Sequence, residues 1–100
     1  MTTIEPIGRT ETQTVRIPNL LGLHARPAAE VVKLASGFAC EIFLAKDDLE
    51  VNGKSIMGVM MLAAECGSDL RISASGEDGI EAVAAIVELV ETGFGEELAS

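Results

Sequence analysis

Two short strand-like segments separated by only Asp47 and Asp48 constrain the fold of this chain more than any other feature. Residues 40–46 place apolar side chains at every second position, and residues 49–51 form a second short strand. Aspartates favour a tight turn. Strands joined by so short a connection run antiparallel, because a parallel pair needs a crossover of about a dozen residues or more. The pattern therefore excludes a purely parallel sheet.

The remaining segments alternate between strand and helix patterns. We expect strands at residues 14–17 and 69–75 and helices at about 25–36, 55–62 and 77–92. The apolar stripe of the last helix is expected to consist of Ile80, Val83, Ala84, Val87 and Val90. The order βαββαβα predicts an α+β sandwich, in which one mainly antiparallel sheet is covered by helices on a single face.

One hundred residues suffice for a single small domain. Residues 1–12 are polar and contain Pro6 and Gly8, so we expect a flexible N-terminal arm there. The folded domain is then expected at residues 13–95 and an acidic C-terminal tail at residues 96–100.

Composition excludes several classes of partner. A net charge of −9 with only seven basic and three aromatic residues argues against nucleic-acid binding. No apolar run is long enough for membrane insertion and the N-terminus has no secretory pattern, so we expect a cytoplasmic protein. Cys40 and Cys66 are not at metal-ligand spacing. We interpret them as reduced thiols and expect no metal, although the sequence alone leaves a disulfide open.

The single histidine, His24, immediately precedes a predicted helix. Free N–H groups and the positive end of the helix dipole attract anions at such a position. Arg26 offers a guanidinium group to phosphate oxygens, while Ala25 and Pro27 support the first helical turn. These features favour a phosphorylatable histidine. The alternative is a surface histidine near a helix end with a solvated Arg26, because short motifs often match by chance.

The segment from Gly22 to Ala28, GLHARPA, resembles the active-site motif of HPr, the histidine phosphocarrier family of the bacterial sugar phosphotransferase system. Residues 52–60 and 72–76 resemble two further parts of that family, so the likeness runs from about residue 14 to 95. It implies an open-faced β-sandwich of four antiparallel strands with three helices on one face. It also implies that His24 takes phosphate from enzyme I, charged by phosphoenolpyruvate, and passes it to enzyme IIA components, with Arg26 stabilising the phosphate.

The resemblance assigns further roles to the segment that follows residue 54. Ser55 matches the serine modified by HPr kinase/phosphorylase, although a serine there also serves as a plain helix cap. Ile56, Met57 and Met60 match the apolar patch that docks enzyme I, although a methionine stripe is more often part of a core.

Two features depart from the family: an N-terminal arm longer by roughly ten residues and an unusually acidic composition. Arg26, Lys33 and Lys54 are expected to retain a local basic spot for partners. The alternatives are a nitrogen-related paralogue, or a mainly regulatory docking module controlled at Ser55. We expect a monomer without cofactor that is a covalent intermediate in a relay, not an independent enzyme, because no nucleophile–base pair or nucleotide loop is present.

Overall fold

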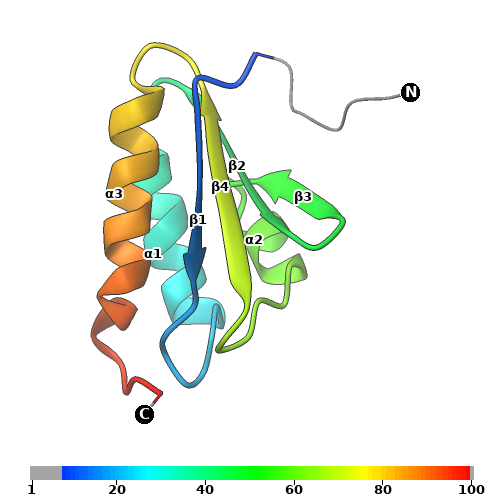
Figure 1. The fold of residues 1–100 in the computed structure, drawn as a ribbon, viewed down its shortest axis with the longest axis vertical. Coiled ribbons are helices and arrows are strands. Elements are labelled where there is room, and N and C mark those ends of the chain that lie inside the picture. The colour runs from blue at the N-terminus through cyan, green and yellow to red at the C-terminus, as the bar shows by residue number, and fades with distance from the viewer. Residues whose placement is uncertain (1–7, 100) are drawn as a thin grey trace.

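The computed structural model describes residues 8–99 and shows one four-stranded sheet with helices packed against it (Figure 1). The elements in chain order are β1 (Glu11–Arg16), α1 (Ala25–Ala35), β2 (Glu41–Lys46), β3 (Leu49–Asn52), α2 (Ile56–Met61), β4 (Asp69–Ser75), α3 (Gly79–Glu91) and a short 3₁₀ turn, η1 (Gly93–Gly95). The predicted order βαββαβα is confirmed, with all three helices on one face of the sheet.

The strands lie in the order β1-β4-β2-β3, and every neighbouring pair is antiparallel. The predicted hairpin joins β2 to β3 through Asp47, whose φ of +53° places it in the left-handed region that aspartate tolerates better than most residues. The central strand β4 has the bounds that the sequence predicted. The fold is therefore the expected open-faced sandwich.

Period-two alternation in the central strands builds the core. Ile42 and Leu44 on β2, and Leu70 and Ile72 on β4, are buried under the helices. Cys40, just before β2, is also buried; it and Cys66 are both free thiols.

The buried face of α3 differs from the predicted stripe, because Ile80 and Ala84 are exposed. Val83 and Val90 of the predicted stripe are buried, and the other buried residues of α3 are Gly79, Ala82 and Ile86. At Gly79 a Cβ atom would lie 3.0 Å from Cβ of Thr10 and 3.3 Å from that of Ala74. The first residue of the helix thus sits directly on the sheet, and this rotation turns Ile80 to solvent.

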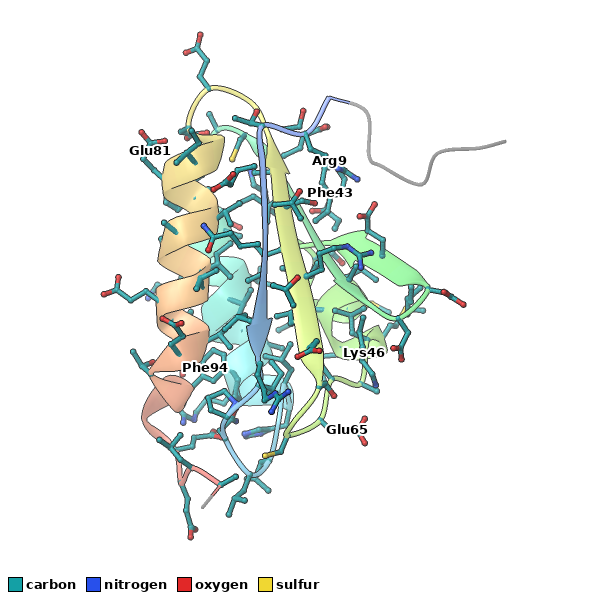
Figure 2. The ribbon with its side chains drawn as sticks, viewed as in Figure 1. Arg9, Phe43, Lys46, Glu65, Glu81 and Phe94 are labelled. Atoms are coloured by element: carbon teal, nitrogen blue, oxygen red, sulfur yellow. The ribbon has the colours of Figure 1, made fainter. Side chains whose placement is uncertain are left out.

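Strand β1 begins three residues earlier than predicted, so the last residues of the expected arm belong to the sheet. Before it, the Arg9 guanidinium lies 3.5 Å from the centre of the Phe43 ring and 2.7 Å from a Glu50 carboxylate oxygen (Figure 2).

The first seven residues of the expected arm lie outside the described residues. Within residues 8–99 no helix is long and apolar enough to cross a membrane.

Candidate functional site around His24

His24 is the last residue before α1, with an extended backbone at φ −75° and ψ −170°. Its carbonyl accepts the N–H of Ala28 at 2.9 Å. Pro27 has no N–H to satisfy, and the N–H groups of Ala25 and Arg26 have no intrahelical acceptor. The first turn contains no acidic residue and no side chain caps it. The expected anion-attracting helix start beside His24 is thus present.

The loop that carries His24 is fixed by a close backbone approach at Gly22. A Cβ atom there would lie 2.5 Å from the carbonyl oxygen of Ala64, and the φ of +67° is one that glycine adopts without strain. The N–H of Leu23 donates to the same carbonyl at 2.8 Å. On the other side, the buried side chain of Asn19 donates to the Gly22 carbonyl at 2.9 Å. The segment after α2 therefore supports the histidine loop.

A second support comes from residues 92–99, which we call the C-terminal strap. Residues 93, 94 and 95 all have positive φ, with Phe94 at +60°, so the chain leaves the α-helical path after α3. The buried Phe94 side chain anchors this bend (Figure 2). The strap then pairs with the histidine loop, because the Leu20 N–H donates to the Glu97 carbonyl and the Ala99 N–H donates to the Pro18 carbonyl, both at 2.9 Å.

Glu96 lies where the strap meets the site. One carboxylate oxygen is 2.7 Å from Nε2 of His24 and 2.8 Å from a guanidinium nitrogen of Arg26. The other accepts a hydrogen bond from the Asn19 side chain at 2.9 Å. Burial alone would raise the pKa of this carboxyl group, but the hydrogen bonds from Asn19, His24 and Arg26 outweigh it and leave the pKa below its ordinary value. Glu96 is therefore held as a carboxylate.

Arg26 makes three hydrogen bonds through its two terminal guanidinium nitrogens. It donates to Glu30 at 2.7 Å along the helix, to the carbonyl of Phe94 at 3.0 Å, and to Glu96. Two carboxylates thus neutralise a guanidinium that was expected to contribute to a basic spot. Of the other residues expected there, Lys54 donates to the Phe38 carbonyl at 2.7 Å and Lys33 is exposed.

Ser55 is the N-cap of α2, as the cap interpretation predicted, and its hydroxyl accepts the N–H of Gly58 at 3.1 Å. Ile56, Met57 and Met60 are exposed on the same helix, while Val59 is its buried residue. The methionines are therefore not core residues. A shallow hollow lined by Leu21, His24, Met60 and their neighbours connects this apolar patch to the histidine.

His24, Ala25, Arg26 and Pro27 lie at the start of α1, where they were expected from the sequence. Asn19 and Glu96, which the structure places beside them, were not singled out from the sequence. Glu96 was assigned to an acidic tail at residues 96–100, whereas the described part of that segment is hydrogen-bonded to the loop at residues 18–20. No group of three or more potential metal ligands occurs within residues 8–99.

Comparison with known proteins agrees with this fold. The family described as "PTS HPr component phosphorylation site" matches residues 11–92. "Phosphocarrier protein HPr" of Treponema pallidum (strain Nichols) is 49% identical over 85% of this chain and 97% of its own. "Phosphocarrier protein NPr" of Escherichia coli (strain K12) is 38% identical over 88% and 99%. The crystal structure of HPr-C-His from Thermoanaerobacter tengcongensis has a TM-score of 0.85 and 48% identity, covering 89% of this chain and all of that one.

A single histidine at a helix start on an open-faced antiparallel sandwich is the arrangement of a histidine phosphocarrier. The chain belongs to the HPr family of the phosphotransferase system.

Proposed function

We propose that His24 accepts a phosphoryl group from enzyme I charged by phosphoenolpyruvate and passes it to enzyme IIA components in sugar uptake. The observation that carries this proposal is the position of His24 at the open start of α1, with its side chain 37% exposed. A phosphoryl group there lies near the unpaired N–H groups of the first turn and near Arg26.

The nitrogen that reacts follows from the contacts of the imidazole ring. Nε2 lies 2.7 Å from the Glu96 carboxylate, which leaves Nδ1 as the nitrogen free to take the phosphoryl group. In the transfer, the Nδ1 lone pair forms the new N–P bond while the bond from phosphorus to the donor breaks, and the donor keeps that electron pair. In the onward transfer, a nucleophile of the acceptor enzyme forms the new bond to phosphorus while the N–P bond breaks and its electron pair returns to Nδ1. Most of the stabilisation of the transition state comes from the partner enzymes.

Arg26 is the phosphate-stabilising residue in this proposal. Its guanidinium group already reaches the carboxylate beside the His24 ring, so only a small reorientation directs a donor to phosphate oxygens. Lysine offers a point charge in place of a planar fork, so Arg26→Lys is expected to accept phosphate more slowly without loss of the fold.

The docking surface for enzyme I is formed by the exposed apolar side chains of α2, namely Ile56, Met57 and Met60. Met57 is 74% exposed, far more than a methionine that serves packing. Unbranched methionines adapt to more than one partner, which suits a carrier that must dock on both a donor and an acceptor.

Regulation at Ser55 is a second part of the proposal. Its hydroxyl is half-buried and engaged only as the cap acceptor for Gly58, so phosphorylation by an HPr kinase/phosphorylase requires release of one hydrogen bond. The added charge would stand next to the apolar docking surface and weaken the contact with enzyme I.

The nitrogen-related branch is the second candidate function. The NPr relative covers as much of the chain as the HPr relative but is less similar, at 38% against 49% identity. We therefore favour the sugar branch, and paired transfer assays with enzyme IIA proteins of each branch decide between them. The expectation of a monomer stays a prediction, which sedimentation equilibrium checks.

The test is phosphorylation with purified enzyme I and labelled phosphoenolpyruvate. The wild-type chain is expected to take up acid-labile phosphate and release it to an enzyme IIA acceptor, while His24→Ala takes up none. Met57→Ala is expected to slow the charging step while leaving the folded state intact, because it removes exposed docking area only. Labelling of His24→Ala, or no labelling of the wild type at saturating enzyme I, would refute the proposal.

A further inference from the structure

The apolar surface beside His24 is larger than the part of it that α2 provides. On the histidine loop, Leu20 and Leu21 are exposed, Leu21 to 71%. Leu21 lines the shallow hollow together with His24 and Met60, so the loop is continuous with the docking surface on α2. Single exposed leucines are ordinary, but apolar side chains grouped around a reactive histidine indicate a contact surface.

The C-terminal strap continues this surface on the other side of the histidine loop. Asn19 and Leu98 form an antiparallel bridge, which places Glu97 opposite Leu20. Leu98 is exposed as well. Residues opposite each other in an antiparallel pair have their side chains on the same face. The exposed carboxylate of Glu97 therefore borders the exposed side chain of Leu20.

Carboxylates surround the apolar residues and form what we call the acidic rim. Glu65 lines the hollow beside His24, and its side chain is 76% exposed. Asp69 does not count toward the rim, because the Arg16 guanidinium lies 3.8 Å from it and offsets its charge. The members of the acidic rim are Glu30, Glu65, Glu96 and Glu97.

The cations beside the acidic rim, Arg26 and Lys46, are already engaged with it. Arg26 is bonded to two of the four carboxylates. Lys46 donates to Glu65 and to a backbone carbonyl, both at 3.1 Å. The exposed Lys33 lies about two turns further along α1, roughly a Debye length from Arg26 at physiological salt. The surface around His24 is therefore net negative, and a phosphoryl group makes it more so.

We propose that this surface docks a basic partner: the phosphoryl donor covers α2, the histidine loop and the strap with an apolar centre and a rim of lysines and arginines. Opposite charges across a rim steer two proteins together and disfavour partners of the wrong sign. The donor's cations also compete with Arg26 for Glu30 and Glu96, which frees the guanidinium group for phosphate oxygens. The inference rests on the proposed function, because it concerns the surface around the same histidine.

Calorimetric binding of enzyme I from the same organism tests the proposal. Phosphoenolpyruvate is left out, so that docking is measured apart from transfer. Salt screens charges at a rim, so the Kd of the wild-type chain is expected to increase about tenfold between roughly 50 and 300 mM NaCl. Glu97→Lys reverses the charge of an exposed residue of the acidic rim and is expected to raise the Kd about five- to tenfold.

Glu81→Lys is the matched control for charge. It changes the net charge by the same amount, but Glu81 lies at the opposite end of α3 from Phe94 and the strap (Figure 2). Its Kd is expected to stay within about twofold of the wild type. Glu65→Gln is a second rim variant if Glu97→Lys does not fold, and it is expected to raise the Kd about two- to fivefold.

The apolar part of the surface has its own pair of variants. Leu20→Ala removes exposed apolar area beside the strap and is expected to raise the Kd about three- to tenfold. Ile80→Ala removes a similarly exposed apolar side chain at the start of α3, remote from the strap, and is expected to bind as the wild type.

Equal effects of Glu97→Lys and Glu81→Lys would overturn the proposal, as would tighter binding by Glu97→Lys, which an acidic partner predicts. Binding that does not weaken with salt, or no binding of the wild type, would overturn it too. Failure of enzyme I to phosphorylate a chain that it binds would refute the proposed function alone, because the binding measurements need no transfer.

Discussion

Gly22 lets the loop that carries His24 lie directly against residues 64–66, and its replacement by alanine is expected to destabilise the fold strongly. A Cβ atom at this position would lie 2.5 Å from the Ala64 carbonyl oxygen and 2.9 Å from Cα of Glu65. Both are backbone atoms, so rotation of a side chain cannot relieve the overlap. The φ of +67° adds conformational strain to any residue that has a Cβ atom.

The two costs can be separated with a matched glycine. A left-handed conformation costs a non-glycine residue about 1–2 kcal/mol, and overpacking adds about 1–3 kcal/mol. Gly22→Ala is therefore expected to lower the free energy of unfolding by about 2–5 kcal/mol. Gly67 has a φ of +89° but no heavy atom within 4 Å of its would-be Cβ atom. Gly67→Ala should accordingly show only the conformational cost, about 1–2 kcal/mol.

Urea denaturation followed by circular dichroism measures both variants, since the chain has no tryptophan for fluorescence. Gly22→Ala is also expected to slow phosphorylation of His24, because the loop must move away from Ala64, whereas Gly67→Ala should leave the rate unchanged. Equal destabilisation by the two substitutions would refute the argument that close backbone approach constrains the histidine loop.

Three further outcomes are expected. Because the pKa of Glu96 is lowered in the folded chain, the stability that its carboxylate contributes is complete above its ordinary pKa and is lost as the pH falls through the lower folded value. The urea midpoint of the wild type should therefore fall more steeply below pH 4.5 than that of Glu96→Gln. Parallel curves for the two proteins would contradict this. Burial raises the pKa of the Cys40 thiol, so iodoacetamide should alkylate Cys66 first, as peptide mapping at neutral pH will show; preferential labelling of Cys40 would argue against the buried site. Ser55→Ala removes the cap of α2 and should cost about 0.5–2 kcal/mol, whereas Ser55→Asn keeps an acceptor for the Gly58 N–H and should cost less; the urea midpoints of the two variants provide the check.

The sheet was predictable because residues that are close together in the sequence determine where its strands lie and which side of each strand is buried. The short turn at Asp47 and Asp48 fixed the direction of two strands, and alternation of side chains identified the buried face of β4. The rotation of α3 was not predictable from apolar residues alone, because it depends on how closely Gly79 approaches the sheet. Ile80, which was expected in the core, therefore lies at the surface.

The histidine and its helix were likewise identified from neighbouring residues, but Glu96 was not. It reaches His24 across 72 positions of the sequence, after a bend in the chain at Phe94. A positive φ at a phenylalanine is not indicated by residue type, since glycine and asparagine are the usual occupants of that region. The glycines on either side predicted the end of a helix and gave no direction for the chain that follows.

The mass of the intact chain after incubation with phosphoenolpyruvate and enzyme I tests the central claim most directly. Measured at neutral pH, it is expected to increase by one phosphoryl group, to return to the unmodified value after brief acid treatment, and to stay unmodified in His24→Ala. An acid-stable increase, or an increase that persists in His24→Ala, would place the phosphate on another residue and contradict the assignment of His24 as the carrier.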